Sequence, residues 1–188
     1  MKVLVLDNYD SFVYNLVYIL RNLGVDVDVF RNDKISVADA GKYDKIMLSP
    51  GPGIPSEAGI MMDLLAAYKT ERSIFGVCLG HQAIAEAFGA QLQNMGEVLH
   101  GVTTTCKVTD SSEKLFKGLP ATFEVCRYHS WTVLPDTMPK ELLTTAIDDK
   151  HQVLAHAHAQ YDIRGVQFHP EAYLTEHGVA IVENWIKA

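Results

Sequence analysis

The first half of the chain alternates short apolar runs with amphipathic helical patterns, and this alternation constrains the fold more than any other feature. The apolar runs typical of strands lie at residues 2–6, 25–30, 44–49 and 73–78. The segments with helical apolar spacing lie between and after them, at residues 10–24, 56–70 and 79–89. Strands and helices in this order predict a parallel sheet that is covered by helices on both faces.

The second half has a different pattern, with short strand-like pieces and few helical ones. These pieces lie at residues 101–108, 122–128, 131–135, 141–147 and 152–159, before a strand in 162–171 and a closing helix in 175–188. We expect antiparallel strands joined to the parallel sheet, in a three-layer α/β/α fold. Gly24 and Gly89 are placed to end helices, and Ser56 is a candidate N-cap. No linker or repeat divides residues 1–188, so we expect a single domain.

The composition narrows the functional classes. A net charge of −7 argues against a nucleic-acid binder, and 48% apolar residues are enough for a core. Three widely spaced cysteines fit neither a disulfide framework nor a zinc site. The first apolar run ends at Asp7, too early for a signal peptide, and no run approaches the length of a membrane helix. We therefore expect a soluble cytoplasmic protein without a membrane partner, a metal or a cofactor.

Cys78 stands between two glycines in the stretch FGVCLGHQ, where a predicted strand meets a predicted helix. The pattern G-x-C-x-G is typical of an elbow that holds its central residue in a strained turn, for which the glycines leave room. At a helix start, free N–H groups and the helix dipole favour a thiolate. These residues indicate either a nucleophile or a small buried cysteine at a tight turn.

A nucleophilic cysteine needs a base, and the base needs a group that orients it. In VQFHPE, His169 and Glu171 are two residues apart, so in an extended chain both side chains leave on one side. Glu171 would then favour one tautomer of the His169 ring. His156 and His158 also share a strand face, but no acidic or cysteine pair accompanies them. For that pair we expect an exposed strand and no metal.

The loop SPGPG, residues 49–53, follows another predicted strand. Pro52 has no N–H, whereas Gly51 and Gly53 each have a donor and no side chain that blocks approach to it. Such a loop can direct an N–H at an oxyanion, and the N–H of Leu79 would supply a second donor. The alternative is a rigid turn that only carries the chain out of the sheet.

Together these segments resemble a triad-type (class I) glutamine amidotransferase over nearly the whole chain. The matching blocks are DNYDSFVYNL (7–16), LSPGPGIPSEAG (48–59), GVCLGHQAI (76–84), RYHS (127–130) and GVQFHPE (165–171). The first two blocks are most similar to the glutaminase subunit, component II, of anthranilate synthase or aminodeoxychorismate synthase. The resemblance implies a flavodoxin-like sheet with added antiparallel strands.

The resemblance implies that a Cys78–His169–Glu171 triad hydrolyses L-glutamine. Cys78 would attack the side-chain amide carbon, His169 would protonate the leaving ammonia and then activate water, and Glu171 would orient His169. The N–H groups of Gly53 and Leu79 would stabilise the oxyanion. The glutamine site of the family would map onto Gly51, Pro52, Gly53, Gln82, Ser130 and Trp131, the last two through backbone groups.

The resemblance also implies a partner, because ammonia released into water is mostly protonated and then no longer nucleophilic. A larger chorismate-binding synthase subunit (component I) would receive the ammonia, for anthranilate (tryptophan) or 4-amino-4-deoxychorismate (folate) synthesis. Two positions depart from the family pattern: Trp131 replaces a smaller aliphatic residue, and Ala172 replaces a serine near Glu171. The alternatives are another cysteine hydrolase on the same fold and a non-catalytic scaffold subunit.

Overall fold

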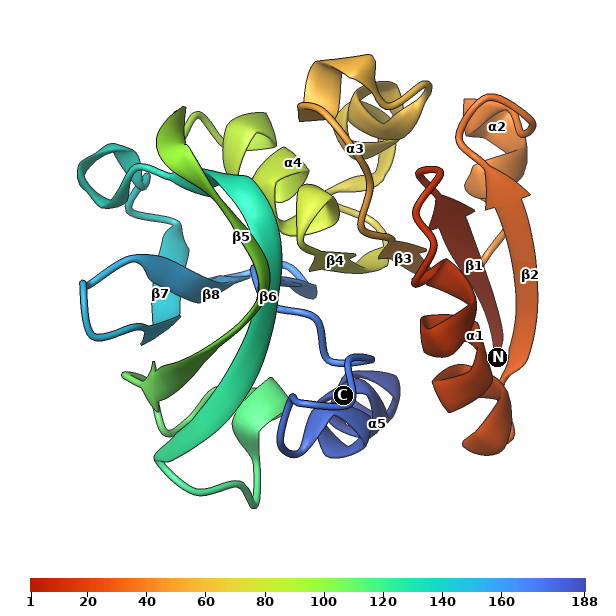
Figure 1. The fold of residues 1–188 in the computed structure, drawn as a ribbon. Coiled ribbons are helices and arrows are strands. Elements are labelled where there is room, and N and C mark those ends of the chain that lie inside the picture. Colours follow the sequence, from red (N-terminus) through yellow and green to blue (C-terminus); the bar gives the residue numbers. More distant parts are fainter.

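One nine-stranded sheet, in the order β2-β1-β3-β4-β9-β8-β7-β5-β6, runs through the computed structural model, which describes residues 1–188 (Figure 1). The strands are β1 Lys2–Asp7, β2 Asp26–Arg31, β3 Lys45–Leu48, β4 Ser73–Val77, β5 Leu92–Val108, β6 Thr122–Val133, β7 Leu142–Ile147, β8 Val153–His158 and β9 Ile163–Val166. The α-helices are α1 Val13–Asn22, α2 Val37–Ala40, α3 Met61–Tyr68, α4 Leu79–Ala87 and α5 Gly178–Lys187. Short 3₁₀ turns lie at Pro55–Glu57, Lys114–Phe116 and Pro135–Thr137.

The sheet has a parallel half and an antiparallel half, which confirms the predicted α/β class. Strands β2, β1, β3, β4 and β9 pair in parallel. Strand β8 pairs antiparallel with β9 and β7, and β5 pairs antiparallel with β7 and β6. The pieces predicted at 122–128 and 131–135 are one strand, β6, because its ladder with β5 continues across the break. That ladder shifts register between Asn94 and Leu99, where β5 bulges away from β6.

Each face of the parallel half packs against its own set of helices. Val3 and Val5 of β1 belong to a core with buried side chains of α1 and α5. Leu4 and Leu6, which point to the other face, belong to a second core with buried side chains of α3 and α4. Figure 1 shows the same division, with α1 and α5 on one side of the sheet and α3 and α4 on the other.

The helix expected from Ser56 begins later than predicted. Ser56 lies in the 3₁₀ turn, and α3 begins at Met61 with Ile60 in the N-cap position. Gly59 separates the two with a φ of +53°, and a Cβ there would lie 2.4 Å from the Asn32 carbonyl oxygen. The prediction of Ser56 as N-cap was wrong because this contact with the loop after β2 imposes a turn that a continuous helix cannot contain. None of the helices has both the length and the apolar composition that crossing a bilayer requires.

Candidate functional site

Four neighbouring parallel strands end beside one another, and the candidate residues follow their carboxyl ends. Asn8 follows β1, Ser49 follows β3, Cys78 follows β4 and Gln167 follows β9. In open α/β sheets, ligands bind in the crevice outside the carboxyl ends of the strands. The sheet order β1-β3-β4-β9 therefore brings together segments that are distant in the sequence.

Cys78 lies in a strained turn between β4 and α4. Its φ of 52° and ψ of −100° are values that residues other than glycine rarely adopt. Both flanking glycines are needed because the backbones approach closely. A Cβ on Gly76 would lie 2.4 Å from the carbonyl group of Gly80, and one on Gly80 would lie 2.4 Å from the Leu48 carbonyl oxygen. Any larger residue at these two places would push α4 away from β3 and β4.

His169 and Glu171 form a hydrogen-bonded pair in the bend after β9, outside the extended part of that segment. Nδ1 of His169 lies 2.6 Å from Oε1 of Glu171, and both side chains are buried. Burial lowers the pKa of His169, but the nearby Cys78 and the Glu171 carboxylate raise it more, so that this pKa lies well above its ordinary value. The raised pKa favours the protonated form of the His169 ring.

No hydrogen bond joins the Cys78 sulfur to the His169 ring. The thiol is directed at the carbonyl oxygen of Tyr128, 3.7 Å away, and Nε2 of His169 is buried without a partner. Oε2 of Glu171 also has no partner, and the methyl group of Ala172 offers no donor.

Two aromatic rings pack against the imidazole. The ring centroid of His169 lies 5.2 Å from that of Tyr128 and 5.8 Å from that of Phe12, both edge-on. Phe12 and Tyr128 also contact each other, with centroids 5.1 Å apart. Phe12 belongs to the DNYDSF segment, so one role of that segment is to hold the imidazole in place.

A cavity of about 630 Å³ opens over Cys78. Its size is in the range of small-molecule sites. Its wall includes seven of the ten residues predicted for the site: Gly51, Pro52, Gly53, Cys78, Gln82, Ser130 and Trp131. His169, Glu171 and Leu79 are not part of this wall, because they are buried behind it or at its edge. Phe12 and Tyr128 also line the cavity, and they cover the imidazole of His169.

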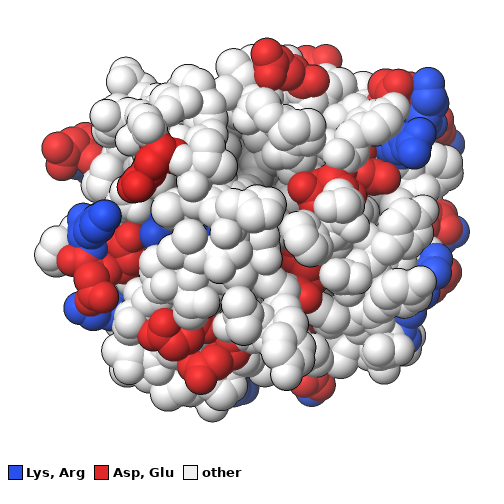
Figure 2. Space-filling model, in the orientation of Figure 1, with Lys and Arg blue, Asp and Glu red and all other residues white.

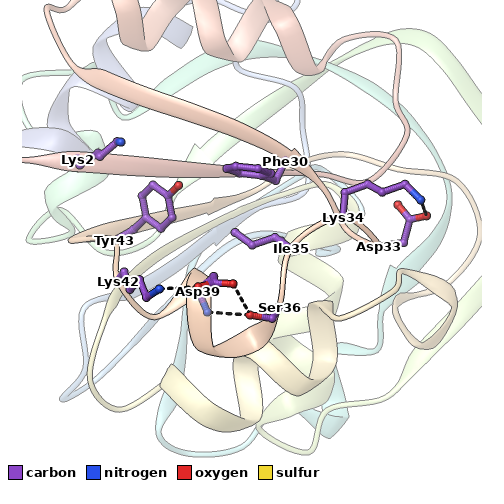
Figure 3. Close-up of a pocket in the computed structure, with 9 residues that line it drawn as sticks. All are labelled: Lys2, Phe30, Asp33, Lys34, Ile35, Ser36, Asp39, Lys42 and Tyr43. Atoms are coloured by element: carbon purple, nitrogen blue, oxygen red, sulfur yellow. Dashed lines mark hydrogen bonds and ion pairs between the residues drawn. The ribbon is translucent and has the colours of Figure 1, made fainter.

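A second hollow lies elsewhere, at the outer edge of the sheet beside β2. It has a volume of about 730 Å³ and is lined by residues of β2 and α2 and the segments next to them (Figure 3). Lys34 pairs with Asp33 at 3.1 Å, and Lys42 pairs with Asp39 at 2.5 Å. Because its charges pair with one another, this hollow directs no free reactive group at a ligand, and the cavity over Cys78 is the candidate site.

Asn8 holds the SPGPG loop, a role that the sequence did not predict. Its Nδ2 donates to the Ser49 carbonyl oxygen at 2.8 Å, and its own N–H donates to Oγ of Ser49 at 2.9 Å. A Cβ on Gly51 would lie 2.6 Å from Cβ of Asn8, so the loop is packed tightly against the end of β1. An asparagine at the end of the first apolar run, next to Asp7, was the available signal.

A chain of hydrogen bonds behind the cavity ends on the carbonyl of Trp131. Asp148 accepts from Nη1 of Arg127 at 2.8 Å, and Nε of Arg127 donates to Nε2 of His129 at 3.0 Å. The other ring nitrogen of His129 must then carry the proton, which it donates to the Trp131 carbonyl oxygen at 2.7 Å. Burial, and then the charge of Arg127, lower the pKa of His129 to about 3, so this ring stays neutral.

Gln82 uses its amide nitrogen within the protein. This nitrogen donates to the Trp131 carbonyl oxygen at 2.8 Å and to Oε1 of Gln167 at 3.1 Å. The carbonyl of Trp131 therefore accepts from both Gln82 and His129 and has no lone pair left for a ligand. Of the Gln82 amide, only Oε1 is left to contact a substrate.

His156 and His158 do not lie on an exposed strand, so that prediction was wrong. All six residues of β8 are buried, because the antiparallel strands close over this part of the sheet. His156 stacks on His81 with ring centroids 4.2 Å apart, and burial lowers the pKa of His156 to about 4. Nowhere in the chain do three His, Cys, Asp or Glu side chains converge as a metal ion would need.

The face of the molecule seen in Figure 1 has no basic surface of the kind that nucleic-acid binding needs. Figure 2 shows Lys and Arg mainly at two sides of this face, with mostly uncharged and acidic residues between them. The charge distribution on this face thus favours binding of a small ligand or a protein over binding of a polyanion.

Comparison with known proteins agrees with this geometry. The glutamine amidotransferase class-I family matches residues 4–188. Anthranilate synthase component 2 of Mycobacterium tuberculosis is 44% identical over 191 residues, covering 99% of this chain and 82% of that one. Aminodeoxychorismate synthase component 2 of Escherichia coli is 44% identical over 186 residues, covering 98% of each chain.

A solved structure shares the fold over the whole chain. It is a protein from Thermoplasma acidophilum that is assigned as a GMP synthase component. The two structures superpose with a TM-score of 0.88 at 29% sequence identity, and the match covers 100% of this chain and 92% of that one. The range matched by the family includes the strained cysteine turn, the histidine–glutamate pair and the residues that line the cavity over Cys78. The chain belongs to the class-I glutamine amidotransferase family.

Proposed function

We propose that this glutamine amidotransferase hydrolyses L-glutamine with Cys78 as nucleophile, His169 as proton carrier and Glu171 as the group that orients His169. The main support is a single arrangement: a cysteine in a strained turn at the cavity wall, next to a buried imidazole whose pKa is raised. A protonated imidazole near a thiol favours the thiolate and has a proton to give to a leaving amine.

The reaction has two steps that balance in atoms and protons. In the first step, the Cys78 thiolate adds to the side-chain carbonyl carbon, and the leaving nitrogen takes the proton of His169 to depart as ammonia. In the second, neutral His169 removes a proton from water, whose oxygen adds to the γ-glutamyl thioester. The carbon–sulfur bond then breaks, which restores the thiolate and releases the product as a carboxylic acid. This acid loses its proton to the solvent and becomes glutamate. The N–H groups of Gly53 and Leu79 would stabilise the oxyanion in both steps.

The glutamine would occupy the cavity between the SPGPG loop and β6. Gly51, Pro52 and Gly53 would face it from one side, and Ser130 and Trp131 from the other. Because the Trp131 carbonyl is already engaged, we expect this residue to contribute through its ring or its N–H. Gln82 would contribute its Oε1.

Substitution of the nucleophile is the direct test. Cys78→Ser should abolish ammonia release from glutamine, measured with the synthase partner present, because such a partner can complete the site. Cys106→Ser is the matched control, since Cys106 is a free, fully buried cysteine outside the cavity. Full glutaminase activity in Cys78→Ser would refute the proposal.

The two alternatives give different results with an electrophile. A glutamine-analogue electrophile should label Cys78, whereas a non-catalytic scaffold would stay unlabelled. Another type of cysteine hydrolase would cleave esters or peptides and release no ammonia from glutamine.

We also infer that residues 1–188 act as one domain beside a chorismate-binding synthase subunit. The names of the relatives, component 2 of anthranilate synthase and of aminodeoxychorismate synthase, support a heteromeric complex. Several aromatic side chains are free to meet a partner: Tyr9, Tyr14, Tyr18 and Tyr173 are 48%, 53%, 58% and 99% exposed. Identifying the synthase that co-purifies with the chain would decide between tryptophan and folate synthesis. Free thiols at all three cysteines support a reducing cytoplasm as its location.

A further inference from the structure

A path of amide side chains connects the Trp131 carbonyl to the sulfur of Cys78. Gln82 donates from Nε2 to this carbonyl at 2.8 Å and to Oε1 of Gln167 at 3.1 Å. Gln167 in turn donates from Nε2 to Sγ of Cys78 at 3.6 Å. Gln82 is 2% exposed and Gln167 is fully buried, so other protein atoms surround most of this path.

The donors and acceptors along this path fix which way each amide points. A backbone carbonyl can only accept, so the Trp131 oxygen requires the NH₂ group of Gln82. The second proton of that NH₂ group must go to an acceptor, which makes Oε1 of Gln167 face Gln82. The NH₂ group of Gln167 then necessarily faces the sulfur. The N–H of Gln167 is itself bonded to the Leu154 carbonyl oxygen at 2.8 Å, which holds the backbone of this residue against β8.

We propose that Gln167 is a further catalytic residue, which stabilises the Cys78 thiolate by donating a hydrogen bond to Sγ, and that Gln82 is the positioning residue that fixes its orientation. This inference rests on the proposed function, in which Cys78 is the nucleophile. It gives the buried glutamine of VQFHPE a role that is separate from the histidine–glutamate pair.

The surroundings of the sulfur explain why this donor matters. In the thiol form, the S–H points at the Tyr128 carbonyl oxygen. That oxygen repels a thiolate, whereas the side-chain NH₂ group of Gln167 attracts it. Hydrogen bonds to charged acceptors are stronger than those to neutral ones. The donor therefore favours the thiolate before attack and again when the thioester breaks, since the sulfur carries negative charge at both points.

The rate of alkylation of Cys78 by iodoacetamide, measured against pH, tests the proposal. Mass spectrometry of the Cys78 peptide separates it from the two other cysteines, which are fully buried. In Gln167→Glu, a carboxylate replaces the donor, and we expect the half-maximal rate about one pH unit or more higher, with alkylation at pH 7 about tenfold slower. Gln167→Met, which is neutral and similar in volume, should shift the profile in the same direction by less.

The charged groups that affect the sulfur, His169 and Arg127, stay in place in these variants. Asn184→Ala is the matched control, since it removes an amide that donates to the Leu115 and Lys117 carbonyl oxygens at 2.9 and 3.0 Å, outside the cavity. It should lower stability and leave the alkylation profile unchanged. Gln82→Met should shift the profile upward, because Gln167 is then free to turn its oxygen to the sulfur.

An unchanged profile in folded Gln167→Met, checked by circular dichroism, would overturn the role of Gln167. An unchanged profile in Gln82→Met would overturn its positioning role. The alkylation readout needs neither glutamine nor a partner subunit, so its failure is distinct from a failure of the proposed function. Retained glutaminase activity in Cys78→Ser would reveal the latter.

Discussion

Removal of the Arg127 guanidinium should weaken both the fold and glutamine binding, by two routes that a matched variant can separate. Arg127 donates to Oδ2 of Asp148 at 2.8 Å, to Gln152 at 2.6 Å and to His129 at 3.0 Å. Its side chain and that of Asp148 are 2% and 5% exposed. Arg127→Met therefore leaves a buried carboxylate without its charged partner.

The cost in stability follows from that unpaired charge. Removing one partner of a buried ion pair costs about 3–5 kcal/mol. Two backbone N–H groups, of Lys150 and Gln152, still bond Oδ1 of Asp148 at 2.9 and 2.8 Å, so we expect the lower end of that range. For a chain of this length each kcal/mol lowers Tm by roughly 2–4 °C, which gives a decrease of about 6–12 °C.

The effect on binding follows from the His129 tautomer. Without the Arg127 donor, Nε2 of His129 can carry the proton, and the bond from Nδ1 to the Trp131 carbonyl is lost. That bond helps to hold Trp131, which lines the cavity, and one neutral hydrogen bond is worth about 0.5–1.5 kcal/mol. With Trp131 less well positioned for glutamine, we expect KM to rise by up to roughly tenfold, with a smaller change in kcat.

Arg164→Met provides the control for this prediction. Nε of Arg164 lies 2.6 Å from Oε1 of Glu113 in another buried pair, and neither residue lines the cavity over Cys78. Differential scanning calorimetry should show similar losses of Tm in the two variants, and steady-state assays with the synthase partner should show a raised KM only in Arg127→Met. An unchanged KM in Arg127→Met, or an equal rise in Arg164→Met, would refute the reasoning.

Three further predictions concern the turn and the two histidine environments. Gly76→Ala places a Cβ 2.4 Å from backbone atoms of α4. The control is Gly118→Ala, where φ is +78° but the space is open, and where we expect a loss of ~1 kcal/mol in the free energy of unfolding. Urea unfolding should show a loss several times larger for Gly76→Ala. Burial holds the pKa of His156 at about 4, so its neutral form stabilises the fold fully above pH 6.5 and less as the pH falls towards 4. The free energy of unfolding should decrease there by up to about 1.4 kcal/mol per pH unit, and His156→Gln should flatten this slope. The raised pKa of His169 changes the stability of the fold with pH in the opposite direction. The stabilisation from protonated His169 is complete below pH 6.5 and is lost at alkaline pH. The stability difference between the wild type and Glu171→Gln should therefore be larger at pH 6 than at pH 10, and an equal difference would contradict the assigned pairing.

The local backbone at the site could be predicted because close packing dictates it. Gly76 and Gly80 are spaced for a turn in which β4 and α4 nearly touch, and the structure has that turn. His169 and Glu171 are two residues apart and hydrogen-bonded, although they lie in a bend and not in the extended segment that was predicted. Both features depend on neighbours in the sequence, so the residues alone contain the information.

Predictions failed where distant segments decide the environment. His156 was expected on an exposed strand, yet it is buried against His81, because α4 and β8 meet only in the folded sheet. Ser56 was expected to cap a helix, yet the Asn32 carbonyl beside Gly59 interrupts it. Neither contact can be recognised from the neighbouring residues in the sequence.

The sequence by itself determined the α/β class, the strained Cys78 turn and the His169–Glu171 pair, because strand and helix periodicity and close backbone approach are local properties. Only the tertiary structure decided how those parts meet. The order β1-β3-β4-β9 aligns four strand ends at one edge, and this brings Gln167 to the sulfur of Cys78 and Asn8 to the SPGPG loop. Hydrogen bonds between residues 41 or 89 positions apart depend on the pairing of strands across the sheet, which no local pattern specifies.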